Sequence, residues 1–158
     1  MVINFLILLL AVLPAIVLIT YIYIVDKKQR EPIPQILKGF LLGIVSAFVA
    51  VFLALFLADY NLYTDTFTNI IDAGRTAFFG AALPEEAAKL FVLWLVLRKN
   101  KYFDEKMDGI VYAVCVSMGF AALENVTYLL SDIDSYIEIG VSRAFTAIPG
   151  HFCFGVVM

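Results

Sequence analysis

The feature that most constrains the fold is an apolar run at the start of the chain, Val2 to Val25, which contains no charged residue. At about 1.5 Å per residue, a helix of this length crosses a hydrocarbon core of about 30 Å. Hydrophobic residues make up 63% of the 158 residues, whereas an ordinary soluble domain contains roughly half. The sequence therefore predicts an all-α polytopic membrane protein.

Charged and proline-containing stretches separate further apolar segments, so we expect a bundle of about five transmembrane helices in a single transmembrane domain. The predicted spans cover about residues 2–25, 36–58, 73–97, 109–130 and 139–158 of the domain 1–158. In the second span Gly39, Gly43 and Ala47 lie four apart, a stripe of small residues that lets another helix approach closely. The chain stops at Met158 without the basic or aromatic flank that usually closes a span, so we expect it to be truncated there.

The distribution of charge predicts how the helices cross the membrane. Basic residues follow the first span, at Lys27, Lys28 and Arg30, and the third span, at Arg98–Lys101, whereas the loop around Asp65 is acidic. Because loops rich in lysine and arginine stay in the cytoplasm, we expect the N-terminus outside. The net charge of −3 is too small to indicate a nucleic-acid partner.

Six polar side chains lie within the predicted spans: Glu85, Glu86, Lys89, Glu124, Asn125 and His151. A charge at mid-membrane costs about 2.5 to 3.5 kcal/mol on insertion scales, so such residues usually face a polar interior and have a function or a partner. Lys89 lies three and four residues after the two glutamates and can neutralise either one along a helix face. Carboxylates that converge with one imidazole indicate a hydrolytic or metal site.

Other readings of the same residues stay open. Glu85, Glu86 and Lys89 can form a buried ion pair that only holds the bundle together. His151 can be a core histidine bound to a carbonyl. At the level of the whole protein, the cluster also suits a non-catalytic membrane scaffold that binds a partner helix, or a proton or ion carrier that uses Glu124 with Glu85 and Lys89 as a relay.

Four segments taken together resemble the PrsW family of intramembrane proteases, which is related to the CAAX prenyl proteases. Pro84–Lys89 looks like its E-E-x-x-K motif, and Asp108–Tyr112 looks like its D-G-x-x-Y segment. Gly119–Asn125 looks like its G-F-A-x-x-E-N segment, and Arg143 followed by Pro149–His151 resembles its histidine helix. The resemblance covers nearly the whole chain in the same order, although members usually continue with further helices.

The resemblance implies a multi-pass protease of the bacterial plasma membrane, commonly labelled a metalloprotease. It implies hydrolysis of a membrane-anchored protein, and the best-known family substrate is an anti-sigma factor cleaved by regulated intramembrane proteolysis in envelope stress signalling. Glu85 and Glu86 match the paired catalytic glutamates, and Glu124 matches the glutamate of the second motif. His151 matches the histidine of the third motif, while Lys89 and Asn125 match supporting positions.

Peptide hydrolysis needs an activated water, a group that stabilises the oxyanion and a proton donor for the leaving amine. We expect Glu85 or Glu86 to be the general base, with Glu124 and His151 binding the water or a metal. For a metal, the expected ligands are Glu85, Glu124 and His151 and the favoured ion is zinc. A zinc site with a single histidine is unusual, so a metal-independent mechanism also stays open.

Overall fold

A computed structural model describes residues 2–26, 30–64, 66 and 68–158, and all the regular structure in these ranges is helical. The all-α prediction is therefore confirmed. Lys27, Lys28 and Asp65, which contribute to the predicted charge pattern, lie outside the described residues. The helices are α1 (Val2–Val25), α2 (Ile33–Asp59), α3 (Ile70–Arg75), the π-helical segment η1 (Thr76–Ala82), α4 (Leu83–Leu97), α5 (Lys106–Ser131), α6 (Tyr136–Phe145) and α7 (Ala147–Val157).

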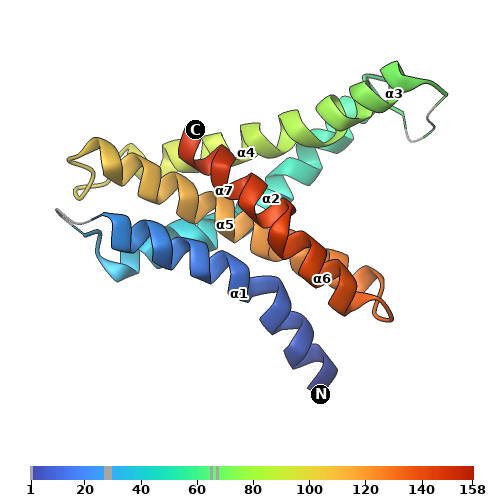
Figure 1. Ribbon diagram of the computed structural model, residues 1–158. Coiled ribbons are helices and arrows are strands. Elements are labelled where there is room, and N and C mark those ends of the chain that lie inside the picture. The colour runs from blue at the N-terminus through green and yellow to red at the C-terminus, as the bar shows by residue number, and fades with distance from the viewer. Residues whose placement is uncertain (1, 27–29, 65, 67) are drawn as a thin grey trace.

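Within the described residues, α1, α2 and α5 are each long and apolar enough to cross a membrane. The predicted spans 73–97 and 139–158 are instead built from consecutive shorter helices. In Figure 1, α3, η1 and α4 form one extended arm, and α6 runs on into α7 across the other helices. The chain turns between α6 and α7 at Thr146, which has φ −119° and ψ −72°.

Helix α5 lies at the centre of the bundle and contacts α1, α2, α4, α6 and α7 (Figure 1). In its most apolar stretch 72% of the residues are buried, compared with 22% for α1 and 17% for α2. Its buried residues include Val114 and Met118, which form a core cluster with Ala15 and Ile22 of α1 and with Ile148 of α7. Helix α5 therefore holds its positions away from the surrounding lipid, and polar side chains on it can meet partners from several helices.

The backbones of α2 and α5 come very close together. A Cβ atom added to Gly43 would lie 2.1 Å from the carbonyl oxygen of Val116, and one added to Gly119 would lie 2.0 Å from that of Phe40. Neither position has room for a side chain because backbone atoms block it. The close helix approach predicted from the small-residue stripe in the second span is confirmed at Gly43.

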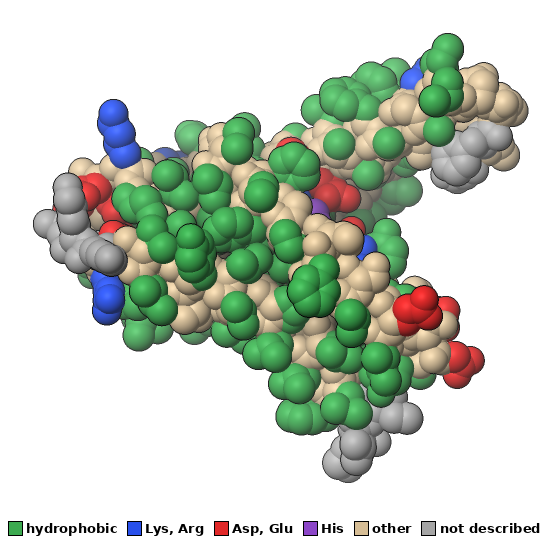
Figure 2. Space-filling view, in the orientation of Figure 1, with side chains coloured by type: hydrophobic (Ala, Val, Ile, Leu, Met, Phe, Trp, Pro, Cys, Tyr) green, Lys and Arg blue, Asp and Glu red, His purple; other side chains and the backbone are tan. Residues whose placement is uncertain are grey.

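The outer surface is largely apolar. Large side chains such as Phe48 and Val51 of α2 are 66% and 60% exposed, and hydrophobic side chains cover much of the face shown in Figure 2. Exposure on this scale is typical of a surface that contacts hydrocarbon rather than water. Together with the lengths of the three apolar helices, it indicates a multi-pass membrane protein.

Candidate functional site

The two adjacent glutamates lie just after the junction between η1 and α4. The amide of Leu83 donates to the carbonyl of Phe78, a five-residue step that widens the helix. Pro84 comes next, buried in the first turn of α4, and it has no amide hydrogen to give to the preceding turn. The break places Glu85 and Glu86 in the first turn of α4, where both side chains are partly exposed.

Lys89 follows one turn later on α4, and its side chain is fully buried. Its Nζ atom lies 2.7 Å from Oε1 of Glu86 and 3.7 Å from Oε2 of Glu85. The same atom lies 4.0 Å from the centre of the Phe120 ring on α5. An ammonium taken out of water without partners would be very costly, and these three contacts offset that cost. The pairing of Lys89 with the glutamates that the sequence predicts is confirmed.

His151 of α7 completes a bridge between α4 and α5. Its Nδ1 atom lies 2.9 Å from Nζ of Lys89, and its Nε2 atom lies 3.0 Å from Oε2 of Glu124. Because an ammonium has no lone pair, Nδ1 is the acceptor from Lys89, and the ring hydrogen belongs to Nε2, which donates to Glu124. Both ring nitrogens therefore bind charged side chains, which excludes the reading of His151 as a core histidine bound to a carbonyl.

Glu124 and Asn125 on α5 are held together by Arg143 of α6. Nη2 of Arg143 donates to Oε2 of Glu124 at 2.6 Å, and Nε donates to Oδ1 of Asn125 at 2.6 Å. The guanidinium lies 3.9 Å from the centre of the Tyr128 ring. Asn125 in turn donates from Nδ2 to the carbonyl of Ala11 in α1 at 3.2 Å. These contacts fix the Glu124 carboxylate and connect it to α6 and α1.

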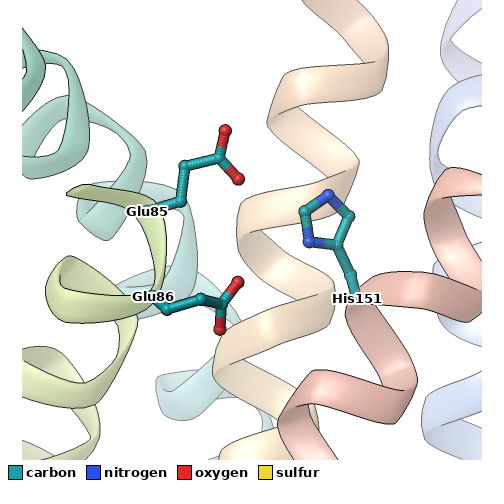
Figure 3. A group of neighbouring side chains, drawn as sticks. All are labelled: Glu85, Glu86 and His151. Atoms are coloured by element: carbon teal, nitrogen blue, oxygen red, sulfur yellow. The ribbon is translucent and has the colours of Figure 1, made fainter. Parts of the chain in front are cut away.

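The structure thus brings Glu85, Glu86, Glu124 and His151 together from three helices. Figure 3 shows both glutamates of α4 pointing across α5 toward His151 on α7. In Figure 2, acidic side chains and the histidine are visible in the hollow between the α3 to α4 arm and the rest of the molecule. The polar side chains form a continuous path in which each contacts the next, in the order Arg143, Glu124, His151, Lys89 and Glu86.

Two residues that shape this path are absent from the predicted site. The sequence singles out Arg143 only as part of the segment that resembles a histidine helix, although Glu124 has no lysine or arginine near it in its own helix and therefore needs a cation from elsewhere. Ser117 of α5 donates from Oγ to the carbonyl of His151 at 2.6 Å and fixes the backbone that carries the imidazole. Nothing in the sequence distinguishes Ser117 from an ordinary small residue of a buried helix.

One group of side chains has the composition of a metal site. Glu85, Glu86 and His151 each offer a ligand atom, and these atoms lie within 4.8 Å of one another. Two carboxylates and one imidazole suit zinc and leave a coordination position open. This group has Glu86 where the sequence-based set has Glu124, whose carboxylate lies between Arg143 and His151. The donor types fit a zinc ion, but the ammonium of Lys89 already contacts all three side chains.

Two of the carboxylates also line a cleft of about 290 Å³ between α2, η1, α4 and α5. Glu85 and Glu124 are the charged residues among its walls, and the other walls come from apolar, small or hydroxyl side chains and from Gly80. Glu86 faces a separate groove beside α7, together with Leu83 and Phe154. The two adjacent glutamates therefore face different surroundings, and Glu85 is the one that shares an apolar cleft with Glu124.

A second polar cluster ties the loop between α1 and α2 to the start of α5. The hydroxyl of Tyr112 donates to the carboxylate of Glu31, and both residues are buried. Burial raises the pKa of Glu31 above its ordinary value, and the negative charges of Asp108 and Asp26 add to the rise. This contact holds the α1–α2 loop against the N-terminal part of α5.

Comparison with known proteins gives a consistent family match. The sequence model of the PrsW family of intramembrane metalloproteases matches residues 31–158. A protein named Protease PrsW from Clostridioides difficile is 33% identical over 151 residues, which are 95% of this chain and 62% of that protein. Proteins of the same name from Bacillus subtilis and Oceanobacillus iheyensis are 34% and 36% identical over 145 residues, 92% of this chain and 62% of each relative.

The chain therefore spans less than two thirds of the length of these relatives. No solved structure matches it. The matched region contains each of the six polar residues on which the site is built.

Proposed function

The chain belongs to the PrsW family of intramembrane metalloproteases, and from this premise we propose that it carries the reaction centre of a membrane-embedded peptidase. The proposed reaction is the hydrolysis of a peptide bond in a membrane-anchored protein. The observation that carries the proposal is the meeting of Glu85 and Glu124 from two helices at one apolar cleft, with His151 of a third helix bound to Glu124. A bundle held together by buried ion pairs alone would have no need to place carboxylates at such an opening.

We assign Glu85 as the general base that activates the water. It borders the cleft, and its carboxylate lies 3.7 Å from the Lys89 ammonium, whereas that of Glu86 is engaged at 2.7 Å. The weaker pairing leaves a Glu85 oxygen available to accept a proton from a water in the cleft. Glu86 then serves to hold Lys89 in place.

Lys89 supplies a positive charge beside Glu85, since its Nζ atom lies 3.7 Å from that carboxylate. The ammonium is anchored by Glu86 and by the imidazole, so it is oriented before substrate arrives. Fixed charges of this kind stabilise a developing oxyanion without reorganisation during the reaction. Glu124 orients the imidazole by accepting from Nε2, and Asn125 keeps Arg143 against Glu124.

Zinc is the proposed metal, with Glu85, Glu86 and His151 as its ligands. When bound, such an ion supplies Lewis-acid polarisation and lowers the pKa of a bound water. The buried Lys89 ammonium contacts the same side chains, so binding of the ion requires Lys89 to move aside. The roles assigned to Glu85, Lys89 and Glu124 therefore do not depend on the ion.

The proposed location is the bacterial plasma membrane, with the N-terminus outside. The α4–α5 loop contains Arg98, Lys99 and Lys101, and the α5–α6 loop contains Asp132 and Asp134, which supports a cytoplasmic position for the first loop. An anti-sigma factor with a membrane anchor is the proposed natural substrate, in line with the family resemblance.

The test uses the complete protein in membranes and a reporter with one membrane-spanning segment. Replacing Glu85 by Gln or His151 by Ala is expected to lower the cleavage rate by about 10²- to 10⁴-fold, the usual contribution of a general base or acid. Gly74→Ala is the matched control, because a Cβ atom there meets no atom of the described residues within 4 Å. Cleavage that persists at the parental rate in both site variants would refute the peptidase and favour a scaffold.

A further inference from the structure

The cleft beside Glu85 has walls of two different kinds. Its α2 wall is made of small side chains at helical spacing, Ala47, Ala50 and Ala54. Its mouth is bordered by Phe48 and Val51, which are 66% and 60% exposed on the outer apolar surface. The cleft therefore connects the two carboxylates with the hydrocarbon around the protein rather than with a polar surface.

The size of the cleft corresponds to a large side chain. An engineered cavity of about 150 Å³ accommodates benzene, and this cleft has about 290 Å³. Alanine at position 54 keeps it open, since a longer side chain there would extend into the same space. A bulky aliphatic or aromatic side chain together with part of its backbone would fill the volume.

The back wall offers the polar groups that an unwound peptide needs. Gly80 and Pro84 line the cleft, and Pro84 has no amide hydrogen to donate to the carbonyl of Gly80. A membrane segment must leave its helix before a peptide bond can be attacked, and each unsatisfied amide costs several kcal/mol in hydrocarbon. We expect the missing donor at Pro84 to leave a main-chain carbonyl of this wall available as the acceptor for such an amide.

We propose that this cleft is the subsite that receives the substrate, and that it takes a bulky apolar side chain next to the scissile bond of a segment that enters from the lipid. The inference rests on the proposed function. Lipid is as apolar as the cleft, so transfer of the side chain gains little hydrophobic free energy, and selection depends on packing and size. The substrate class is accordingly a membrane-spanning segment with a leucine or phenylalanine at that position.

Tyr63 lies beside two residues of the subsite walls, Ala54 and Gly80. Its hydroxyl donates to the carbonyl of Ala54 at 3.1 Å, and its ring lies 3.2 Å from the position of a Cβ atom on Gly80. The loop after α2 is thus attached to both walls of the cleft. An extended segment bound there would run from the mouth at Val51 toward Tyr63.

The first experiment measures side-chain preference in the complete protein. Three single-span reporters carry Ala, Leu or Phe at the position before the cleaved bond. Ala54→Leu is expected to lower cleavage of the Leu and Phe reporters about tenfold relative to the Ala reporter, the effect of one or two methylenes in an apolar pocket. Retained cleavage of the Ala reporter shows that the variant is folded. Ala77→Leu, at an exposed alanine of η1 that does not line the cleft, is the control and should leave the ratios unchanged.

The second experiment does not require cleavage. In a Glu85→Gln, Cys153→Ser background, Ala54→Cys is expected to form a disulfide with a cysteine in the membrane segment of the Leu reporter, and Ala77→Cys is not. Cross-linking at position 54 without any cleavage in the parent would leave the subsite standing and refute the peptidase. Two results would overturn the subsite alone, provided that the parent cleaves normally. One is an Ala54→Leu variant that cleaves the Ala, Leu and Phe reporters in the parental ratios. The other is the absence of a cross-link at position 54.

Discussion

The Nζ atom of Lys89 lies 2.9 Å from Nδ1 of His151, although 62 residues separate them in the chain. The same atom lies 2.7 Å from a carboxylate oxygen of Glu86. A buried ammonium therefore contacts the oxygen and nitrogen donors that a metal ion would use, and the two cations compete for one place.

Replacing Lys89 by Ala is expected to create a stronger zinc site and a less stable apoprotein. The variant leaves the carboxylates of Glu85 and Glu86 without their buried cation, and loss of one partner of a buried pair typically costs about 3 to 5 kcal/mol. Because both glutamates keep some exposure, solvent screening places the cost below that range. Thermal unfolding with and without chelator, together with metal analysis of the purified protein, measures both effects.

Lys38→Ala is the control for this variant, because Lys38 is an exposed lysine on α2. It should change neither zinc content nor stability. A Lys89→Ala protein that unfolds at the parental temperature in chelator and binds no more zinc than the parent would show that Lys89 does not occupy a cation site.

Arg143→Gln is expected to reduce cleavage by about 10- to 100-fold, the usual effect of removing a group that orients an active-site residue. The Glu124 carboxylate would lose its 2.6 Å partner and would hold the imidazole of His151 less firmly. Arg143 does not line the cleft, so kcat should fall while KM and the preference among the Ala, Leu and Phe reporters stay unchanged. A change in that preference would place Arg143 in substrate recognition instead.

The stability of the protein should fall as pH rises through the titration of Glu31. Burial raises the pKa of this carboxyl in the folded state above its value in the unfolded chain. Between the two pKa values the folded state binds more protons, so the stabilising contribution is complete below the unfolded pKa and is lost above the folded one. Unfolding midpoints between pH 4 and 8 should show this decline in the parent and a flatter profile in Glu31→Gln.

Glu138→Gln is the control for the pH experiment, since Glu138 is an exposed glutamate on α6. Its profile should follow the parental one. Parallel profiles for the parent and Glu31→Gln would mean that the contact between Glu31 and Tyr112 does not depend on the charge of the carboxyl.

Gly43→Ala and Gly119→Ala are expected to destabilise the bundle by at least about 1 to 3 kcal/mol, the usual cost of overpacking. Each new methyl group would meet a backbone carbonyl oxygen at 2.1 Å or 2.0 Å, and backbone cannot turn aside as a side chain can. Unfolding temperature and the yield of monodisperse protein in detergent measure the loss. Gly74→Ala adds the same methyl group in open space and should behave like the parent.

Much of the helical framework was predictable because it follows from local composition. The apolar run of α1 and the long runs of α2 and α5 are visible without any tertiary information, and the structure forms helices over all three. The breaks in the other two predicted spans depend on proline. Pro149, in the first turn of α7, cannot donate to the carbonyl of Phe145, and α6 ends at that residue.

The site was predictable in its residue types and less so in its connections. Glu85, Glu124 and His151 stand out because ionisable residues are rare in apolar runs. The pairing of charged side chains from different helices depends on how those helices cross, and a sequence pattern does not specify the crossing. Arg143 shows the difference, because its partner Glu124 lies 19 residues away on another helix.

The burial of α5 has a consequence for how the protein enters the membrane. Helices α1 and α2 bury only 22% and 17% of their most apolar stretches and can partition into lipid one at a time, whereas α5 is less apolar and buries 72% of its most apolar stretch among its neighbours. A helix that contains Glu124 and Asn125 therefore gains its stability in the bilayer from helices already inserted. Biogenesis should proceed in that order, with α5 held at the translocon until α1 and α2 can receive it.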